Sequence, residues 1–137
     1  MADAPKTFKV TIVTPFGRQR EYEVRHMRAP GSEGDFGVLA GHLPFLTALR
    51  VGEIELDTLE GKRIWATSGG FAGVLGDNVT ILAETAEPAD KIDLERADAA
   101  RRRAEERLSA KSQDIDTKRA KIALARAMNR IKISKLT

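Results

Sequence analysis

Hydrophobic and polar residues alternate along the first part of the chain. Phe8, Val10 and Ile12 are each separated by one residue, and this period of two is typical of a β-strand. Tyr22, Val24 and His26 repeat the pattern after a turn signal at residues 16–17. Six more short runs of the same kind follow, at 36–39, 46–51, 52–56, 63–68, 71–75 and 79–83.

Turn signals rich in glycine separate these runs. They are Pro30-Gly31, Gly41, Glu60-Gly61-Lys62, Gly69-Gly70 and Gly76-Asp77-Asn78. Short strands joined by glycine turns over about 80 residues predict a β-sandwich or barrel and disfavour a βαβ sheet.

The last 50 residues have a helical period instead. We expect the first helix to begin at Asp90 as N-cap, with Asp93 in its first turn. The apolar positions then step by three or four, at Leu94, Ala97, Ala100, Ala104 and Leu108. The pattern pauses at 109–113, where Ser112 or Asp114 can cap a second helix. The apolar face of that helix is Ala120, Ala123, Leu124, Ala127 and Ile131.

Alanine predominates on both apolar faces, so the two helices can approach closely while burying little area. A buried alanine contributes far less than the roughly 1.5–3 kcal/mol of a buried leucine. We therefore expect a helical hairpin that is held only marginally and can move.

Composition divides the 137 residues at the same place. All 11 glycines and all 7 aromatic residues lie at or before Gly76, and the last of the 5 prolines is Pro88. Residues 1–87 carry 9 Lys and Arg against 12 Asp and Glu, a net charge of −3, whereas residues 88–137 carry 14 against 8, a net charge of +6. The sequence therefore predicts two units, a β-domain at 1–87 and a helical hairpin at 88–137.

Most catalytic chemistry is disfavoured by the residues present. The absence of cysteine excludes disulfides, thiolate catalysis and cysteine-based zinc sites. His26 and His42 have no carboxylates at metal-ligand spacing, and Ser68 lacks the Gly-x-Ser-x-Gly elbow of a hydrolase. No apolar run approaches the roughly 20 residues of a transmembrane helix, and no signal or transit segment is recognisable. We expect a protein that is not an enzyme, spans no membrane and needs no metal.

Arginines form the one constellation that indicates binding. At 100° per residue, Ile92, Arg96 and Arg103 fall within about 40° on the first helix, with Asp93 beside them. Arg119, Arg126 and Arg130 do the same on the second helix. If the hairpin folds on itself, these guanidinium groups can converge and bind phosphates. An acidic protein partner and a solvated basic face are equally open at this point.

The order of short motifs resembles one known family, the epsilon subunit of the proton-translocating ATP synthase. The matching stretches in the β-domain are 10–15 with Gly17, 34–39, 41–44, 68–71 and 79–83. Those in the helices are 92–97, 114–116, 118–120 and 126–130. Together they cover essentially the whole chain.

The resemblance implies a β-sandwich of about ten strands followed by a two-helix antiparallel hairpin. It also implies a rotor subunit of the central stalk, peripheral on the cytoplasmic face of the cell membrane. Its partners would be the gamma subunit and the membrane c-ring, and the catalytic alpha/beta head when the helices extend and inhibit ATP hydrolysis.

The resemblance further implies that ATP, as a regulatory ligand, stabilises the folded-down hairpin. Its Ile/Leu-Asp-x-x-Arg-Ala motif corresponds to Ile92, Asp93, Arg96 and Ala97. The accompanying ATP-binding positions are Glu87, Arg103, Arg119, Arg126 and Arg130. Candidate rotor contacts in the β-domain are Gly41, His42, Leu43, Pro44, Ser68, Gly69, Gly70 and Phe71.

Two interpretations compete with a rotor subunit. A free-standing nucleotide sensor would use the same arginines without joining a rotary complex. A basic hairpin for nucleic acid is disfavoured, because the helices lack aromatic residues for base stacking and acidic residues interrupt their charge.

Overall fold

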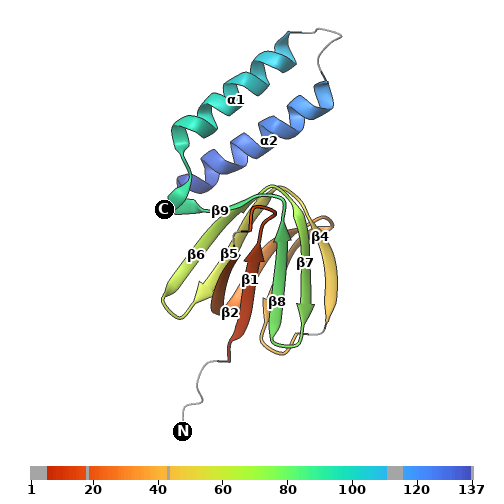
Figure 1. Ribbon diagram of the computed structural model, residues 1–137, viewed down its shortest axis with the longest axis vertical. Helices are drawn as coiled ribbons and strands as arrows, with labels where there is room; N and C mark the ends of the chain where they lie inside the picture. Colours follow the sequence, from red (N-terminus) through yellow and green to blue (C-terminus); the bar gives the residue numbers. More distant parts are fainter. Residues whose placement is uncertain (1–5, 18, 43, 111–115, 137) are drawn as a thin grey trace. The chain divides into compact units, whose positions relative to one another are not determined.

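The computed structural model describes residues 6–17, 19–42, 44–110 and 116–136. The chain divides into two compact units, Met1–Glu87 and Pro88–Thr137. Nine strands make up the first unit and two helices the second, so the predicted fold class is confirmed, with nine described strands where about ten were expected (Figure 1).

The strands follow one another through short turns. They are β1 (Phe8–Val13), β2 (Gln19–Gly31), β3 (Gly34–Leu39), β4 (Phe45–Leu49), β5 (Gly52–Thr58), β6 (Gly61–Thr67), β7 (Gly70–Leu75), β8 (Asn78–Ala83) and β9 (Ala86–Pro88). The hydrogen-bonded order is β1-β8-β7-β4-β2-β5-β6-β9, with β3 on β2 and a further pairing of β1 with β2. All the pairings with a described register are antiparallel except β1 with β8, which is parallel.

The long strand β2 links the two halves of the sandwich. Its first half pairs with β1, and its second half pairs with β3 and β5. This corrects the expected turn at Pro30-Gly31, because both residues remain in β2 and the turn falls on residues 32–33. The three-residue strand β9 is an element that the alternation did not predict.

A β-bulge corrects the predicted inward face of β2. Val24 is opposite Thr58 and His26 is opposite Asp57, so one extra residue stands in β2 between these pairs. The bulge shifts the alternation by one position. Val24, Met27 and Ala29 are therefore buried, and His26 is only half-buried.

Side chains from both halves of the sandwich form the core. Phe8, Val10 and Ile12 of β1 are buried as predicted, against residues such as Ile54 and Ile81. Trp65 is a buried member of this core and donates its Nε1–H to the Tyr22 hydroxyl at 3.0 Å. Because Trp65 is the sole tryptophan, its fluorescence reports on the β-domain alone.

After Pro88, the second unit contains a short 3-10 helix, Ala89–Lys91, followed by α1 (Leu94–Ser109) and α2 (Thr117–Ser134). The two helices run side by side in opposite directions (Figure 1). The structure thus contains the antiparallel hairpin that the sequence predicted.

Candidate functional site

Aspartates cap both helices of the hairpin. The Asp93 carboxylate accepts from the Arg96 backbone N–H at 3.1 Å, and that of Asp116 accepts from the Arg119 backbone N–H at 3.0 Å. The predicted cap Asp90 is wrong, because that residue belongs to the 3-10 helix and the N-cap of α1 is Asp93, three residues later. Asp116 likewise replaces the predicted caps of α2, Ser112 and Asp114, which lie outside the described residues.

Small buried side chains form the seam between the helices. Ala97 and Ala104 of α1, and Ala120 and Ala127 of α2, are at most 2% exposed. Leu94, predicted on the same face as Ala97, is instead 46% exposed. With only a methyl group at each of these positions, the helices can pack closely, so the site is built on a narrow seam.

The seam determines where the arginines lie. Measured from the buried alanines at 100° per residue, Arg96 and Arg103 fall about 100–120° to one side of α1. Arg119, Arg126 and Arg130 fall about 80–120° to the same rotational side of α2. In an antiparallel pair, flanks on the same rotational side point to one face of the hairpin. The five predicted arginines therefore share one face, which we call the arginine face.

The antiparallel course also sets the order along this face. Residues early in α1 lie beside residues late in α2 (Figure 1). From its position in α1, Arg96 is therefore level with the segment of α2 that holds Arg126 and Arg130. Arg103 is level with Arg119, nearer the connection between the helices. At 1.5 Å per residue, the face extends over about 16 Å. It is an elongated stripe that suits an extended anion.

The other predicted ligand-binding residues are less uniform. Ile92 follows the 3-10 helix and is half-buried, and Asp93 is exposed at the start of α1. Ala97 is fully buried in the seam, so its place in the motif is explained by helix packing. Glu87 lies in β9, at the end of the first unit, and is half-buried.

Sequence reasoning overlooked one arginine. Arg107 is four residues beyond Arg103 and falls about 80° from the seam on the same side. It also stands in the last turn of α1, where a cation is favoured by the helix dipole. The four-residue spacing between Arg103 and Arg107 could have identified Arg107 from the sequence.

The opposite flank of α1 is occupied by ion pairs. Asp98 accepts from Arg101 at 2.7 Å and from Arg102 at 2.6 Å, and Arg101 also reaches Glu105 at 3.2 Å. Hydrogen bonds from Arg101 and Arg102 hold the pKa of Asp98 below its usual value. In the described part of the chain, none of the ion pairs uses Arg96, Arg103, Arg107 or Arg119.

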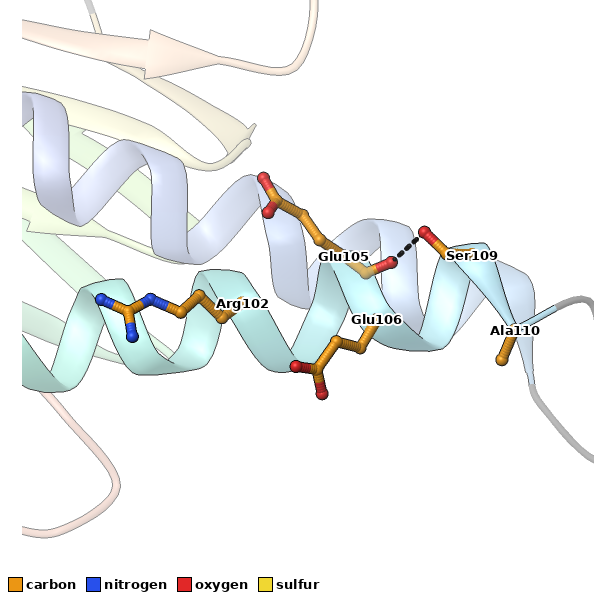
Figure 2. Close-up of a pocket in the computed structure, with 5 residues that line it drawn as sticks. All are labelled: Arg102, Glu105, Glu106, Ser109 and Ala110. Carbon is orange, nitrogen blue, oxygen red and sulfur yellow. Dashed lines mark hydrogen bonds between the residues drawn. The ribbon is translucent and has the colours of Figure 1, made fainter.

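A shallow hollow on α1 is not the predicted site. It is lined by Arg102, Glu105, Glu106, Ser109 and Ala110, and the Ser109 hydroxyl donates to the Glu105 carbonyl at 2.9 Å (Figure 2). All five residues come from one helix and its C-cap, and two are carboxylates. No residue of α2 lines the hollow, and its two carboxylates would repel a phosphate.

The two candidate rotor-contact loops of the β-domain are shaped by glycine. Gly41 has φ +80°, and beyond it the His42 ring packs on Phe45 with centroids 5.1 Å apart. Leu43 lies outside the described residues, and Pro44 precedes β4. In the second loop, Ser68 and Gly69 lead into Gly70, where φ is +136° and the backbone of β8 is so close that a Cβ atom would clash with the Leu82 carbonyl oxygen.

An apolar surface continues from the second loop across the outer side of the sheet. Phe71 pairs with Leu82 on β8 and with Ala48 on β4, and both Phe71 and Leu82 are 54% exposed. Leu46 and Leu75 extend this surface and are more than 70% exposed. Of these residues the sequence reasoning named Phe71 alone. The three consecutive apolar residues at 81–83 were a signal that both faces of β8 are apolar.

The outer side of the other half of the sandwich is charged. Arg28 on β2 contacts Glu53 at 3.0 Å and Glu55 at 2.9 Å, and Lys62 on β6 contacts Glu55 at 2.8 Å. The hydrogen bond from Lys62 is the main cause of a lowered pKa at Glu55. The β-domain therefore has one apolar and one ion-paired outer surface.

Two other kinds of site are absent from the described residues. They contain no group of three or more His, Cys, Asp or Glu side chains arranged to hold a metal ion. None of their helices is long and apolar enough to cross a membrane.

Comparison with known proteins gives one consistent family. Residues 7–89 match the model of the ATP synthase delta/epsilon chain β-sandwich domain, and residues 90–135 match that of its long α-helix domain. The ATP synthase epsilon chain of Bacillus velezensis is 44% identical over 129 residues, covering 94% of this chain and 98% of the relative. That of Desulforamulus reducens is 46% identical over 129 residues, covering 93% and 96%.

A solved structure agrees over the whole chain. A chain in the mitochondrial ATP synthase of Euglena gracilis, in a structure of OSCP, F1 and the c-ring, superposes with a TM-score of 0.79 at 25% identity. The match covers 99% of this chain and 85% of that one.

A β-sandwich followed by a helical hairpin, matched by both models, defines the class: the chain belongs to the delta/epsilon family of ATP synthase subunits. Within that family its bacterial relatives are epsilon chains, and it is an epsilon subunit of the bacterial type. The resemblance found in the sequence is thereby confirmed.

Proposed function

We propose that this chain is a non-catalytic subunit of the central stalk, which joins the gamma subunit to the membrane c-ring and lies peripherally on the cytoplasmic face of the cell membrane. Its family and its full-length match to bacterial epsilon chains support this role. The Euglena structure that it resembles contains F1 and the c-ring.

The apolar surface of the β-domain is the proposed contact with the gamma subunit. Exposed apolar surface of this kind is typical of a protein interface. Phe71→Glu should prevent co-purification with the gamma subunit, whereas Leu39→Glu, a matched change at an exposed position on β3, should not. Equal assembly of both variants would place the contact elsewhere, for example on the other candidate rotor-contact loop at 41–44.

The hairpin binds ATP through the arginine face. The observation that carries this proposal is the convergence of arginines from two helices on one face, because several guanidinium forks can bind successive phosphates with charge-assisted hydrogen bonds. Ile92 would pack on the base. Asp93 has one carboxylate oxygen in the helix cap, which leaves the other to accept from the adenine amino group.

Calorimetric titration of the isolated subunit tests the site. ATP should bind more tightly than ADP, and ADP more tightly than AMP, because each further phosphate adds charge opposite the arginines. Arg103→Ala should weaken ATP binding about tenfold or more, because one charge-assisted hydrogen bond is lost. Arg102→Ala is the matched control, since Arg102 pairs with Asp98 on the other flank. Equal affinities for the three nucleotides would refute the phosphate site.

Bound ATP would hold the hairpin folded and so relieve inhibition of hydrolysis. A ligand at a hundredfold excess over its Kd stabilises the bound state by about 2.7 kcal/mol, enough to change a population about a hundredfold. When ATP falls, the released helices would contact an acidic surface of the catalytic alpha/beta head. Reconstituted complex with the full chain should hydrolyse low ATP more slowly than complex with residues 1–87 alone. Identical rates would exclude inhibition of hydrolysis by the hairpin, but would not contradict the proposed binding of ATP.

A further inference from the structure

Arginine and lysine are sorted onto different sides of α2. Its three arginines all belong to the arginine face. Lys118, Lys121 and Lys132 fall about 100–160° from the seam in the opposite rotational direction. Lys135 follows at the C-cap. The helix contains no Asp or Glu, so neither side is neutralised from within α2.

The lysine side is exposed and partly apolar. All four lysines are exposed. Met128 and Ile122 flank the lysines, Met128 at about 80° on the lysine side and Ile122 nearly opposite the seam, and they are 51% and 43% exposed. Leu136 follows Lys135 and is 51% exposed. We call this surface the lysine surface, with members Lys118, Lys121, Ile122, Met128, Lys132, Lys135 and Leu136.

The flank of α1 on the same face of the hairpin differs in charge. It carries the carboxylates of Asp98 and Glu105, which are paired with Arg101 and Arg102. The helix α1 contains no lysine, so the lysines of the two helices all belong to α2.

The kind of cation indicates the kind of anion. An arginine fork suits one phosphate or carboxylate in fixed geometry, whereas a lysine ammonium is a compact, hydrated charge on a flexible stem. Flexible lysines can place their stems along apolar surface and keep their charges in water. Together with exposed Ile and Met, they suit an anionic bilayer, where the apolar groups enter the headgroup boundary and the ammonium groups meet lipid phosphates.

We infer that the lysine surface of α2 binds the surface of an anionic phospholipid membrane. An acidic protein surface would match the charge but would leave Ile122 and Met128 against carboxylates. Because the lysines and the arginines of α2 are on different flanks of the helix, lipid binding does not displace a nucleotide. The inference thus stands independently of the proposed ATP site.

Co-sedimentation of the full chain with vesicles tests it. Binding is expected to vesicles of phosphatidylglycerol and phosphatidylcholine, to be absent with phosphatidylcholine alone, and to fall as salt is raised. The double variant Lys121→Glu/Lys132→Glu should lower partitioning onto the anionic vesicles at least about thirtyfold, because the attraction of two lysines to the anionic surface is lost. Lys6→Glu/Lys9→Glu makes the same charge change at exposed positions of the β-domain and should bind almost as well as the original chain.

Two further measurements keep the result interpretable. Circular dichroism should show that both double variants retain their helices, and Ile122→Gln/Met128→Gln should also weaken binding although it leaves the charge unchanged. Equal losses in the two lysine double variants would mean that net charge alone acts, and would overturn the inference. Binding to soluble polyglutamate without binding to anionic vesicles would overturn it in favour of an acidic protein partner.

Discussion

Replacing Ala127 by leucine should open the hairpin. Ala127 is 2% exposed in a seam of alanines, and a leucine adds three heavy atoms where the helices are in close contact. Overpacking of this kind costs about 1–3 kcal/mol. Since the arginine face exists only while the helices are packed, up to the same free energy should be lost from ATP binding, a weakening of up to about 150-fold.

The matched control is Ala125→Leu, two residues away on the exposed side of α2. It has the same change in volume and in helix propensity but no neighbouring helix to displace. Thermal melting of the helices, followed by circular dichroism, should shift downward only for Ala127→Leu. Trp65 fluorescence should melt unchanged in both variants, because it reports on the β-domain. Equal helix melting and equal ATP affinity in the two variants would refute the alanine seam as the support of the site.

Three further predictions concern the β-domain. Gly70→Ala should lower the free energy of urea unfolding by at least about 3 kcal/mol, because φ is +136° and the new Cβ would clash with the backbone of β8. Gly73→Ala is the near-neutral control, because a Cβ there meets only an ordinary side-chain contact. Tyr22→Phe should lower the free energy of unfolding by about 1–2 kcal/mol, because the buried Trp65 Nε1–H loses its acceptor. An unchanged urea midpoint would contradict this prediction. The pKa of Glu55 is lowered, so its ion pair with Lys62 stabilises the fold fully above the ordinary carboxylate pKa. This stabilisation is lost as the pH falls through the folded-state pKa. The Lys62→Gln variant should therefore lose less unfolding free energy than the original chain between about pH 6 and pH 3.

Local patterns in the sequence are sufficient for the two units and most of their elements. Alternation locates the strands because successive side chains of a strand point to opposite faces. The spacing of Arg119, Arg126 and Arg130 places them on one side of a helix by itself, because 3.6 residues per turn is a local property. The same spacing argument identifies the seam alanines Ala97 and Ala127.

Tertiary structure decided how these local patterns combine. A bulge between β2 and β5 moved His26 off the inward face, and alternation within one strand does not reveal an extra residue opposite its partner. Packing of the helices determined that the arginines of α1 and α2 share one face while the lysines of α2 lie on another. A helical period specifies the angles between residues of one helix, but the side that is buried is set by the neighbour against which the helix packs.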